Sequence, residues 1–197
     1  MTAITNESLS QLLVSVRNCQ HCKESLPLAP KPVLRVNASA RLLIIGQAPG
    51  IRVHNSGIPW NDPSGDRLRR WLGLSSAQFY DESMIAIMPM GFCYPGTGKR
   101  GDLPPRRECA ELWHQQLLDR LPNIQLTLLV GQYAQRYYLA DNYRSLAERV
   151  KHWRDFLPEF MPLVHPSPRN QLWLKKNPWF EKDVIPNLQS AISKLLQ

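Results

Sequence analysis

The stretch LLIIGQAPG at residues 42–50 decides the fold, because four consecutive apolar residues run directly into a turn of glycine and proline. Apolar strands without alternation are typical of parallel sheets that are covered on both faces. Ligands of such sheets bind at the carboxyl ends of the strands. The turn at 46–50 is therefore a candidate site, with a tight strand-to-loop corner as the alternative interpretation.

Further apolar runs repeat this pattern along the chain. They lie at 84–88, 126–130 and 160–164, and helical patterns occupy 6–17, 63–73, 105–121, 132–140 and 178–196. Strands that alternate with helices indicate an open α/β sheet with right-handed crossovers. We expect a three-layer α/β/α fold with a central four-stranded parallel sheet, formed by residues 1–197 as a single domain.

Charge and composition indicate the class of partner. The 197 residues carry a net charge of +8, which favours a polyanionic partner such as DNA, although a solvated basic surface is the alternative. No apolar run approaches the roughly 20 residues that cross a bilayer, and the start MTAITNES lacks the order of a secretory signal. We expect a cytoplasmic monomer without a membrane partner.

Four cysteines form two pairs along the chain. Cys19 and Cys22 lie in NCQHC, whereas Cys93 and Cys109 flank a turn-rich, proline-containing segment. Cytosolic thiols remain reduced, so disulfides are not expected. Two pairs of thiolates suit a tetrahedral zinc ion or a cubane iron–sulfur cluster, and four reduced thiols without a metal remain the alternative.

Polar motifs follow the first and the last predicted strands. Gln47 lies in GQAPG, and His165 begins the motif HPSPRN at 165–170. The carboxyl ends of parallel strands share one edge of a sheet, so these two side chains are expected to face one crevice. Neither motif is a P-loop, because no Gly-x-x-x-x-Gly-Lys follows a strand.

The order of the motifs resembles the uracil-DNA glycosylase superfamily, most closely its iron–sulfur branch, family 4. That branch opens with Cys-x-x-Cys, carries Gly-Glu-Ala-Pro-Gly and Gly-x-Pro-Phe-Val-Gly-x-Ala-Gly, and ends with a third cysteine, a proline-rich loop, a fourth cysteine and His-Pro-Ser. Here GQAPG, GIPWNDPSG at 57–65 and HPS at 165–167 occupy those places. The resemblance implies the α/β/α fold and a structural [4Fe–4S] cluster, with zinc as the alternative, on Cys19, Cys22, Cys93 and Cys109.

The resemblance also implies a pocket for a base that has been flipped out of DNA. Gly46 and Ala48 would line it, and Gln47 stands where the family carries the acidic residue that orients water. Trp60 stands where an aromatic side chain stacks on the base, and His165 where a histidine donates toward the base oxygen. These roles would hold the base and stabilise the negative charge that it takes as it leaves.

Four further residues are candidates for contact with the DNA backbone. Ser167 occupies a phosphate-contacting place of the family, and Arg169 lies where better-known branches insert an apolar wedge. A guanidinium there can stack on a base or pair with a phosphate. Lys175 and Lys176 follow closely and are expected to contact phosphates.

Three departures from the family pattern bear on activity. Gln47 is neutral and cannot offer a carboxylate, and the family's base-reading Asn falls on Pro89, which lacks an amide side chain and a backbone N–H. Asn61 and Asp62 replace Val-Gly, so Asp62 is a candidate for the missing charge and Asn61 for the missing edge contact. A turn stabilised by both side chains before Pro63 is the alternative.

Three functions are consistent with this sequence. The first is a DNA glycosylase that hydrolyses the N-glycosidic bond of a flipped uracil or another deaminated base. The second is a DNA-binding module of the same fold with weak or no excision, as the neutral Gln47 would suggest. The third is a nucleotide-handling enzyme with a different chemistry.

Overall fold

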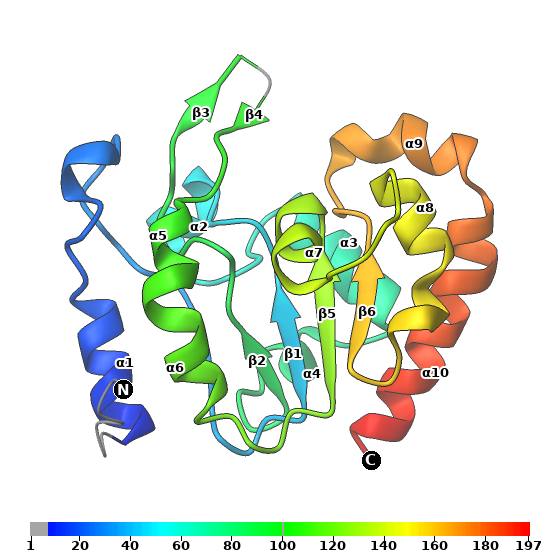
Figure 1. The fold of residues 1–197 in the computed structure, drawn as a ribbon, viewed down its shortest axis with the longest axis horizontal. Helices are drawn as coiled ribbons and strands as arrows, with labels where there is room; N and C mark the ends of the chain where they lie inside the picture. Colours follow the sequence, from blue (N-terminus) through cyan, green and yellow to red (C-terminus); the bar gives the residue numbers. More distant parts are fainter. Residues whose placement is uncertain (1–7, 100) are drawn as a thin grey trace.

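Four parallel strands form the central sheet, in the order β2-β1-β5-β6 (Figure 1). The structure is a computed structural model and describes residues 8–99 and 101–197. The strands are β1 (Leu42–Ile45), β2 (Ile85–Ile87), β5 (Leu126–Val130) and β6 (Phe160–Leu163). In register, Ile44 pairs with Ile87 on one side and Leu128 on the other. The predicted four-stranded parallel sheet is confirmed.

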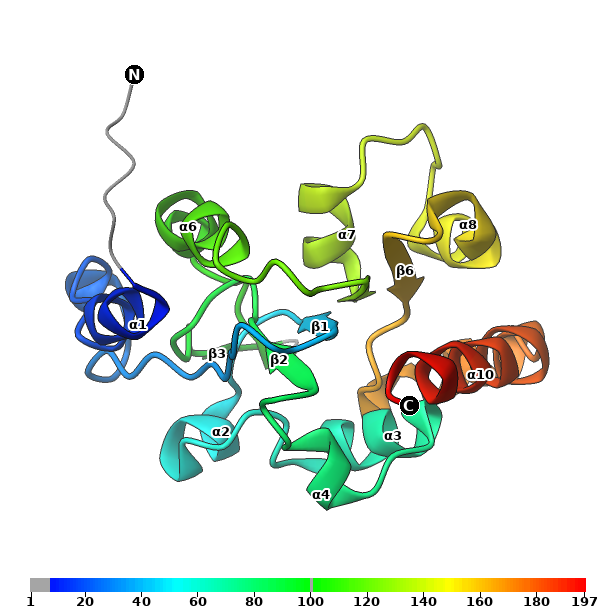
Figure 2. The same cartoon turned by 90° about the horizontal axis from the view of Figure 1, so that it is seen from below.

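Both faces of the sheet are covered, which explains the absence of alternation in LLII. Leu42 and Ile44 pack in one core, Leu43 and Ile45 in the other, and all four are fully buried. Figure 2 shows the two helical layers on either side of the sheet. One layer contains α1 (Leu9–Arg17), α6 (Gln115–Leu118) and α7 (Gln132–Tyr138); the other contains α2 (Ile51–Ser56), α3 (Pro63–Leu72), α4 (Ser76–Phe79) and α10 (Ile185–Leu195).

Local sequence sets the helix ends that matter for the site. Asp62 caps α3 and Pro63 is its first residue; Gly73 ends it in the left-handed region, with φ of 68°. Ser8 and Gln11 form a capping box at the start of α1. Residues 6 and 7, where this helix is predicted to begin, lie outside the described residues.

Shorter helical segments complete the chain. They are η1 (Lys23–Ser25), α5 (Arg107–Cys109), η2 (Ala110–His114), α8 (Leu146–Lys151), η3 (Trp153–Phe156), η4 (Pro168–Asn170), α9 (Gln171–Lys176) and η5 (Phe180–Val184). The predicted helix at 105–121 is α5, η2 and α6 in series, and the one at 178–196 is η5 and α10. No helix of the described residues is both long and apolar enough to cross a membrane.

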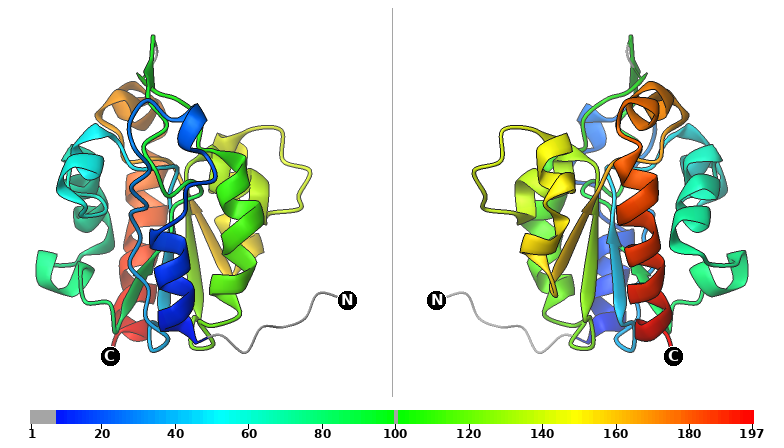
Figure 3. Two further views of the ribbon diagram at one scale, coloured as in Figure 1. Left: turned by 90° about the vertical axis from the view of Figure 1, so that its left-hand side faces the viewer. Right: turned by 90° about the vertical axis from the view of Figure 1, so that its right-hand side faces the viewer.

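A small hairpin rises beyond the carboxyl ends of the strands, and the sequence patterns do not predict it. Its strands are β3 (Thr97–Gly98) and β4 (Gly101–Asp102), which pair antiparallel. Figures 1 and 3 show the hairpin projecting at the same end of the molecule as α9. Two strands of two residues each are too short for an alternation pattern, so contacts with the rest of the fold must hold the hairpin.

Candidate active site

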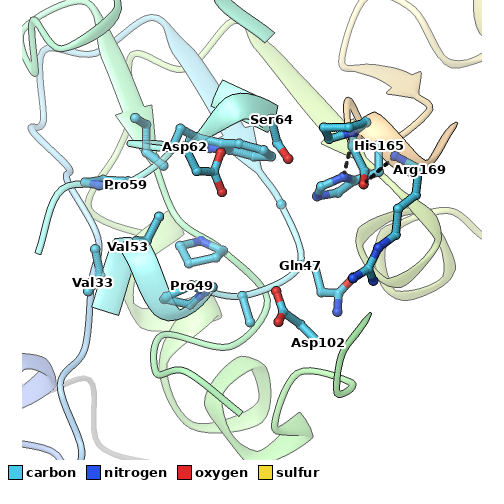
Figure 4. A pocket seen from close by; sticks show the side chains of 18 of the residues that line it. Val33, Gln47, Pro49, Val53, Pro59, Asp62, Ser64, Asp102, His165 and Arg169 are labelled. Carbon is cyan, nitrogen blue, oxygen red and sulfur yellow. Dashed lines mark hydrogen bonds between the residues drawn. The ribbon is translucent and has the colours of Figure 1, made fainter. Parts of the chain in front are cut away.

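A pocket of about 620 Å³ opens at the carboxyl edge of the sheet. Segments distant in sequence line it: the turn after β1, the loop before α3, the β3–β4 hairpin and the HPSPRN segment after β6 (Figure 4). The expectation that Gln47 and His165 face one crevice is therefore met. The sequence-derived candidates that line the pocket are Gly46, Gln47, Ala48, Trp60, Asp62, His165, Ser167 and Arg169.

Trp60 is held in a strained backbone conformation on one wall of the pocket. Its φ is 58°, a left-handed value that is unusual for a side chain of this size. The Tyr80 hydroxyl donates to the Pro59 carbonyl at 2.9 Å, and Arg69 Nη1 donates to the Trp60 carbonyl at 3.3 Å. A Cβ atom at Gly46 would lie 2.7 Å from the indole. The first glycine of GQAPG thus leaves room for Trp60.

His165 lies beside Trp60, with ring centroids 5.6 Å apart and an interplanar angle of 36°. The backbone N–H of Ser167 donates to His165 Nδ1 at 3.2 Å, so the neutral ring carries its proton on Nε2. Burial lowers the pKa of His165, against the opposing effect of the Asp62 and Asp102 carboxylates. The neutral imidazole therefore presents Nε2–H as a hydrogen-bond donor.

Asp62 both caps α3 and lines the pocket. Its Oδ1 accepts a hydrogen bond from the backbone N–H of Gly65 at 2.8 Å. This hydrogen bond agrees with the alternative interpretation, in which Asp62 stabilises the turn before Pro63. The same carboxylate also lines the pocket. Asn61 is exposed and is not among the residues that line the pocket.

Gln47 is bound to the hairpin. Its Nε2 donates to the carbonyl of Leu103 at 3.1 Å, just after β4. The hairpin also contacts Arg169. A Cβ atom at Gly101 would lie 1.6 Å from Arg169 Nη1, so the guanidinium packs directly on this glycine, which has φ of 116°. The hairpin is thus anchored to the first and the last strand-end motifs, and it forms one side of the pocket mouth.

Among the pocket residues that sequence reasoning missed, two have side chains that can take part in chemistry. Asp102 reaches the pocket from β4, and Gln132 from the first position of α7. Gln132 follows Gly131 at the carboxyl end of β5, so the strand-end rule that selected Gln47 and His165 would have found it. No comparable signal marks Asp102, because only the hairpin brings it to the sheet edge.

The remaining candidates for DNA contact lie on α9, outside the pocket. Lys175 and Lys176 are exposed there, and Leu172 on the same helix has 72% of its surface exposed. Figure 1 shows α9 at the end of the molecule that carries the hairpin. Helix α9 therefore brings exposed basic and apolar residues to the end of the molecule that carries the hairpin.

Pro89 lines the pocket, as the segment after β2 pairs with the GQAPG turn. Met90 N–H donates to the Gly46 carbonyl at 2.9 Å, and Gly91 N–H to that of Gln47 at 3.0 Å. Behind Pro89, His114 is buried and its Nε2 lies 3.1 Å from the Pro89 carbonyl. Burial lowers the pKa of His114 to about 4, so the ring is neutral at pH 7 and donates to Pro89.

A second, smaller cavity brings the four cysteines together. Cys19, Cys22, Cys93 and Cys109 all line it, together with Phe92, Arg106 and Trp113; we refer to it as the cysteine cavity. Burial raises the pKa of Cys93 to about 11 and that of Cys109 to about 12. Among the described residues, no group of three or more Cys, His, Asp or Glu side chains is arranged to hold a metal ion.

Two buried donors of the cysteine cavity have no hydrogen-bond partner among the described residues. They are Trp113 Nε1 and Arg106 Nε. A buried donor without an acceptor costs about 1–3 kcal/mol. Unsatisfied N–H donors beside four thiols are expected where a bound group offers sulfur or oxygen atoms as acceptors.

The comparison with protein families agrees with the fold and with the position of the pocket. Residues 35–189 match the model of the uracil DNA glycosylase superfamily, which is more than half of the chain. The chain belongs to this superfamily. Uracil DNA glycosylase superfamily proteins act on DNA, which fits the basic residues beside the pocket mouth.

The superfamily match includes all four strands of the central sheet and, apart from Val33, every residue that lines the pocket. It also includes Cys93 and Cys109, but it begins after Cys19 and Cys22. The match therefore assigns the chain to the superfamily and does not assign it to the iron–sulfur branch.

Proposed function

We propose that the protein is a DNA glycosylase, which hydrolyses the N-glycosidic bond of a flipped uracil or another deaminated base. The observation that carries this proposal is the pairing of Trp60 with His165 in the pocket, 5.6 Å between ring centroids. The indole offers a stacking face, and His165 Nε2–H offers a donor to the base oxygen. A donor fixed in place before the reaction stabilises the anion of the departing base.

The groups for reading the base edge differ from the family pattern. Pro89 has no side-chain donor, and its carbonyl accepts from His114. Gln132 lines the pocket, and its amide has no hydrogen-bond partner among the residues described. An amide offers both a donor and an acceptor, so we assign Gln132 to recognition of the Watson–Crick edge.

We further propose that the cysteine cavity holds a [4Fe–4S] cluster bound by Cys19, Cys22, Cys93 and Cys109. Four thiols line one cavity, and four thiolates are the ligand set of a cubane cluster. The unsatisfied Trp113 Nε1–H and Arg106 Nε–H supply donors for sulfur. The cluster would join the segment after α1 to the segments after β2 and at α5.

DNA binding is assigned to the end of the molecule that carries the pocket mouth. Arg169, Lys175 and Lys176 are exposed there, and Ser167 lines the pocket. Phosphate contacts release counterions, so affinity should fall steeply between low and physiological salt. The double change Lys175→Ala, Lys176→Ala should weaken binding equally across sequences.

The test is a panel of labelled oligonucleotides, single- and double-stranded, that contain uracil, hypoxanthine or xanthine. Excision leaves an abasic site that alkali cleaves, whereas binding alone leaves the strand intact. Trp60→Ala should weaken capture of the modified base, because base–aromatic stacking is worth roughly 1–3 kcal/mol. Salt-dependent binding without cleavage of any substrate would contradict the proposal and favour a DNA-binding module.

A further inference from the structure

We propose that Asp102 is the carboxylate that activates water in this pocket, in place of the acid that Gln47 does not provide. This inference rests on the proposed glycosylase function. Among the described residues that line the pocket, the side-chain acids are Asp62 and Asp102. The two differ in what already engages them and in what surrounds them.

Asp102 belongs to β4 and points into the pocket from the hairpin. Figure 4 shows its carboxylate beside the Gln47 side chain, across the pocket from Asp62. Its Oδ1 accepts from the Thr97 hydroxyl at 3.2 Å, and its Oδ2 would lie 3.2 Å from a Cβ at Gly50. The last glycine of GQAPG thus leaves room for this carboxylate.

Asp62 is committed to a structural contact. Its Oδ1 satisfies the Gly65 N–H at the start of α3, where the helix dipole also stabilises its negative charge. An acid that the helix end already stabilises is a weaker proton acceptor. Among the described residues, the Thr97 hydroxyl is the single hydrogen-bond partner of Asp102, so the carboxylate keeps further acceptor capacity at the pocket.

Gln47 and Asp102 together form a water site. Because Gln47 Nε2 donates to the Leu103 carbonyl, Oε1 is left as an acceptor on a side chain that lies beside Asp102. A water molecule can donate one hydrogen to each of these oxygens and turn its lone pair toward the sugar. The contact from Gln47 to Leu103 also fixes the residue next to Asp102, which positions the carboxylate.

In the reaction, the bond between C1′ and the base nitrogen breaks, and its electron pair leaves with the base. The water oxygen bonds to C1′ and its proton passes to Asp102, from which solvent removes it. The base anion, held by the His165 Nε2–H hydrogen bond, takes a proton from solvent. The negative charge of Asp102 also stabilises the positive charge that develops on the sugar.

The electrostatics of the pocket agree with this geometry. The Asp102 carboxylate raises the pKa of His165, as Asp62 does, against the larger effect of burial. The charge of Asp102 therefore reaches His165, as that of Asp62 does. It is positioned to interact with a cation formed between Asp102 and His165.

The experiment compares Asp102→Asn with Asp62→Asn and with the control Asp119→Asn, which makes the same charge change at an exposed residue after α6. Asparagine retains an oxygen for the Thr97 hydroxyl, so the hairpin contact is kept. In single-turnover excision, Asp102→Asn should lose about 10²-fold or more, as for general bases. Asp62→Asn should lose less, and Asp119→Asn should match the unchanged protein.

A binding measurement provides a readout that does not depend on excision. DNA with a cationic pyrrolidine at the abasic position should bind more tightly than DNA with a neutral tetrahydrofuran. Asp102→Asn should reduce this preference by about tenfold, the size of one close charge pair in a partly exposed site. Asp119→Asn should leave the preference unchanged.

The outcomes separate the two proposals. Excision by the unchanged protein together with full activity and full cation preference in Asp102→Asn would overturn the role of Asp102 and leave the glycosylase function standing. Absence of excision with every base would overturn the proposed function. If Asp102→Asn abolishes the cation preference, that result would still support the placement of the negative charge. If the unchanged protein shows no cation preference, that result would refute the placement.

Discussion

The segment that follows β2 contributes to both the pocket and the cysteine cavity, and the two are built in opposite ways. Pro89 lines the pocket, whereas Phe92 and Cys93 line the cysteine cavity. In the open pocket, His165 and Gln47 each have a hydrogen bond with a neighbour and keep a second polar atom for a ligand. The cysteine cavity contains buried donors without partners.

Because the two regions are built differently, substitutions in them should have different consequences. A change in the pocket should alter chemistry while the fold stays intact, because its groups are at the edge of the sheet. A change in the cysteine cavity should alter stability, because the cavity joins the segment after α1 to the segments after β2 and at α5. Excision rate and unfolding are therefore the two measurements that distinguish a change in the pocket from a change in the cysteine cavity.

The largest effect is expected for His165→Ala. Loss of the Nε2 donor should reduce the single-turnover rate by 10²- to 10³-fold, the usual size for one donor to a developing anion. The melting temperature should stay within a few degrees of that of the unchanged protein. His152→Ala, at an exposed histidine outside the pocket, is the control. A comparable rate for His165→Ala and the control would place the chemistry elsewhere.

Cys109→Ser should have the reverse profile. The unchanged protein, purified without oxygen, should absorb broadly near ~400 nm, and the variant should lose this absorption. Loss of the cluster should lower the free energy of unfolding by about 3 kcal/mol or more, which corresponds to roughly 10 °C in melting temperature. Colourless unchanged protein with one zinc ion per chain would contradict the cluster.

His114 connects the two regions, and its titration tests whether they are separable. Its ring stacks on Phe92 with centroids 5.6 Å apart, and it donates to Pro89. Its pKa is about 4 in the folded protein and near 6.5 when unfolded, so the unfolded state binds more protons between these values. Stability should therefore fall as pH falls from 6.5 to 4.

The contribution of His114 should be roughly 3 kcal/mol, measured by urea unfolding at several pH values. His114→Gln retains hydrogen-bonding capacity toward Pro89 and Tyr138 but does not titrate, so its stability should depend less on pH in this window. If the free energy of unfolding of His114→Gln changes with pH as steeply as that of the unchanged protein, other titrating groups cause the pH dependence.

The smallest effect is expected for Gln47→Glu. A carboxylate cannot donate to the Leu103 carbonyl, and it would repel Asp102, so excision should fall by about tenfold. Gln78→Glu is a matched control, because glutamate serves equally well in the capping box at α4. A faster rate in Gln47→Glu would show that the pocket accepts the acid of the family pattern, and would count against Asp102.

Single-sequence patterns were sufficient for the parts of this protein that local periodicity encodes. Continuous apolar runs marked the four strands, and the strand-end rule brought Gln47 and His165 to one edge. Pro63 and Gly73 marked the two ends of α3. These signals can be read from the sequence because burial on both faces and helix capping are determined by residues that are adjacent or regularly spaced.

The sequence by itself thus determined the layers, the edge at which the pocket opens and most of its lining. Only the tertiary structure decided how each polar group is used. It placed Asp102 in the pocket through the β3–β4 hairpin, which Gln47 and Arg169 contact. The physical reason is that these roles depend on contacts between residues 40 or more positions apart, which leave no periodic trace in the chain.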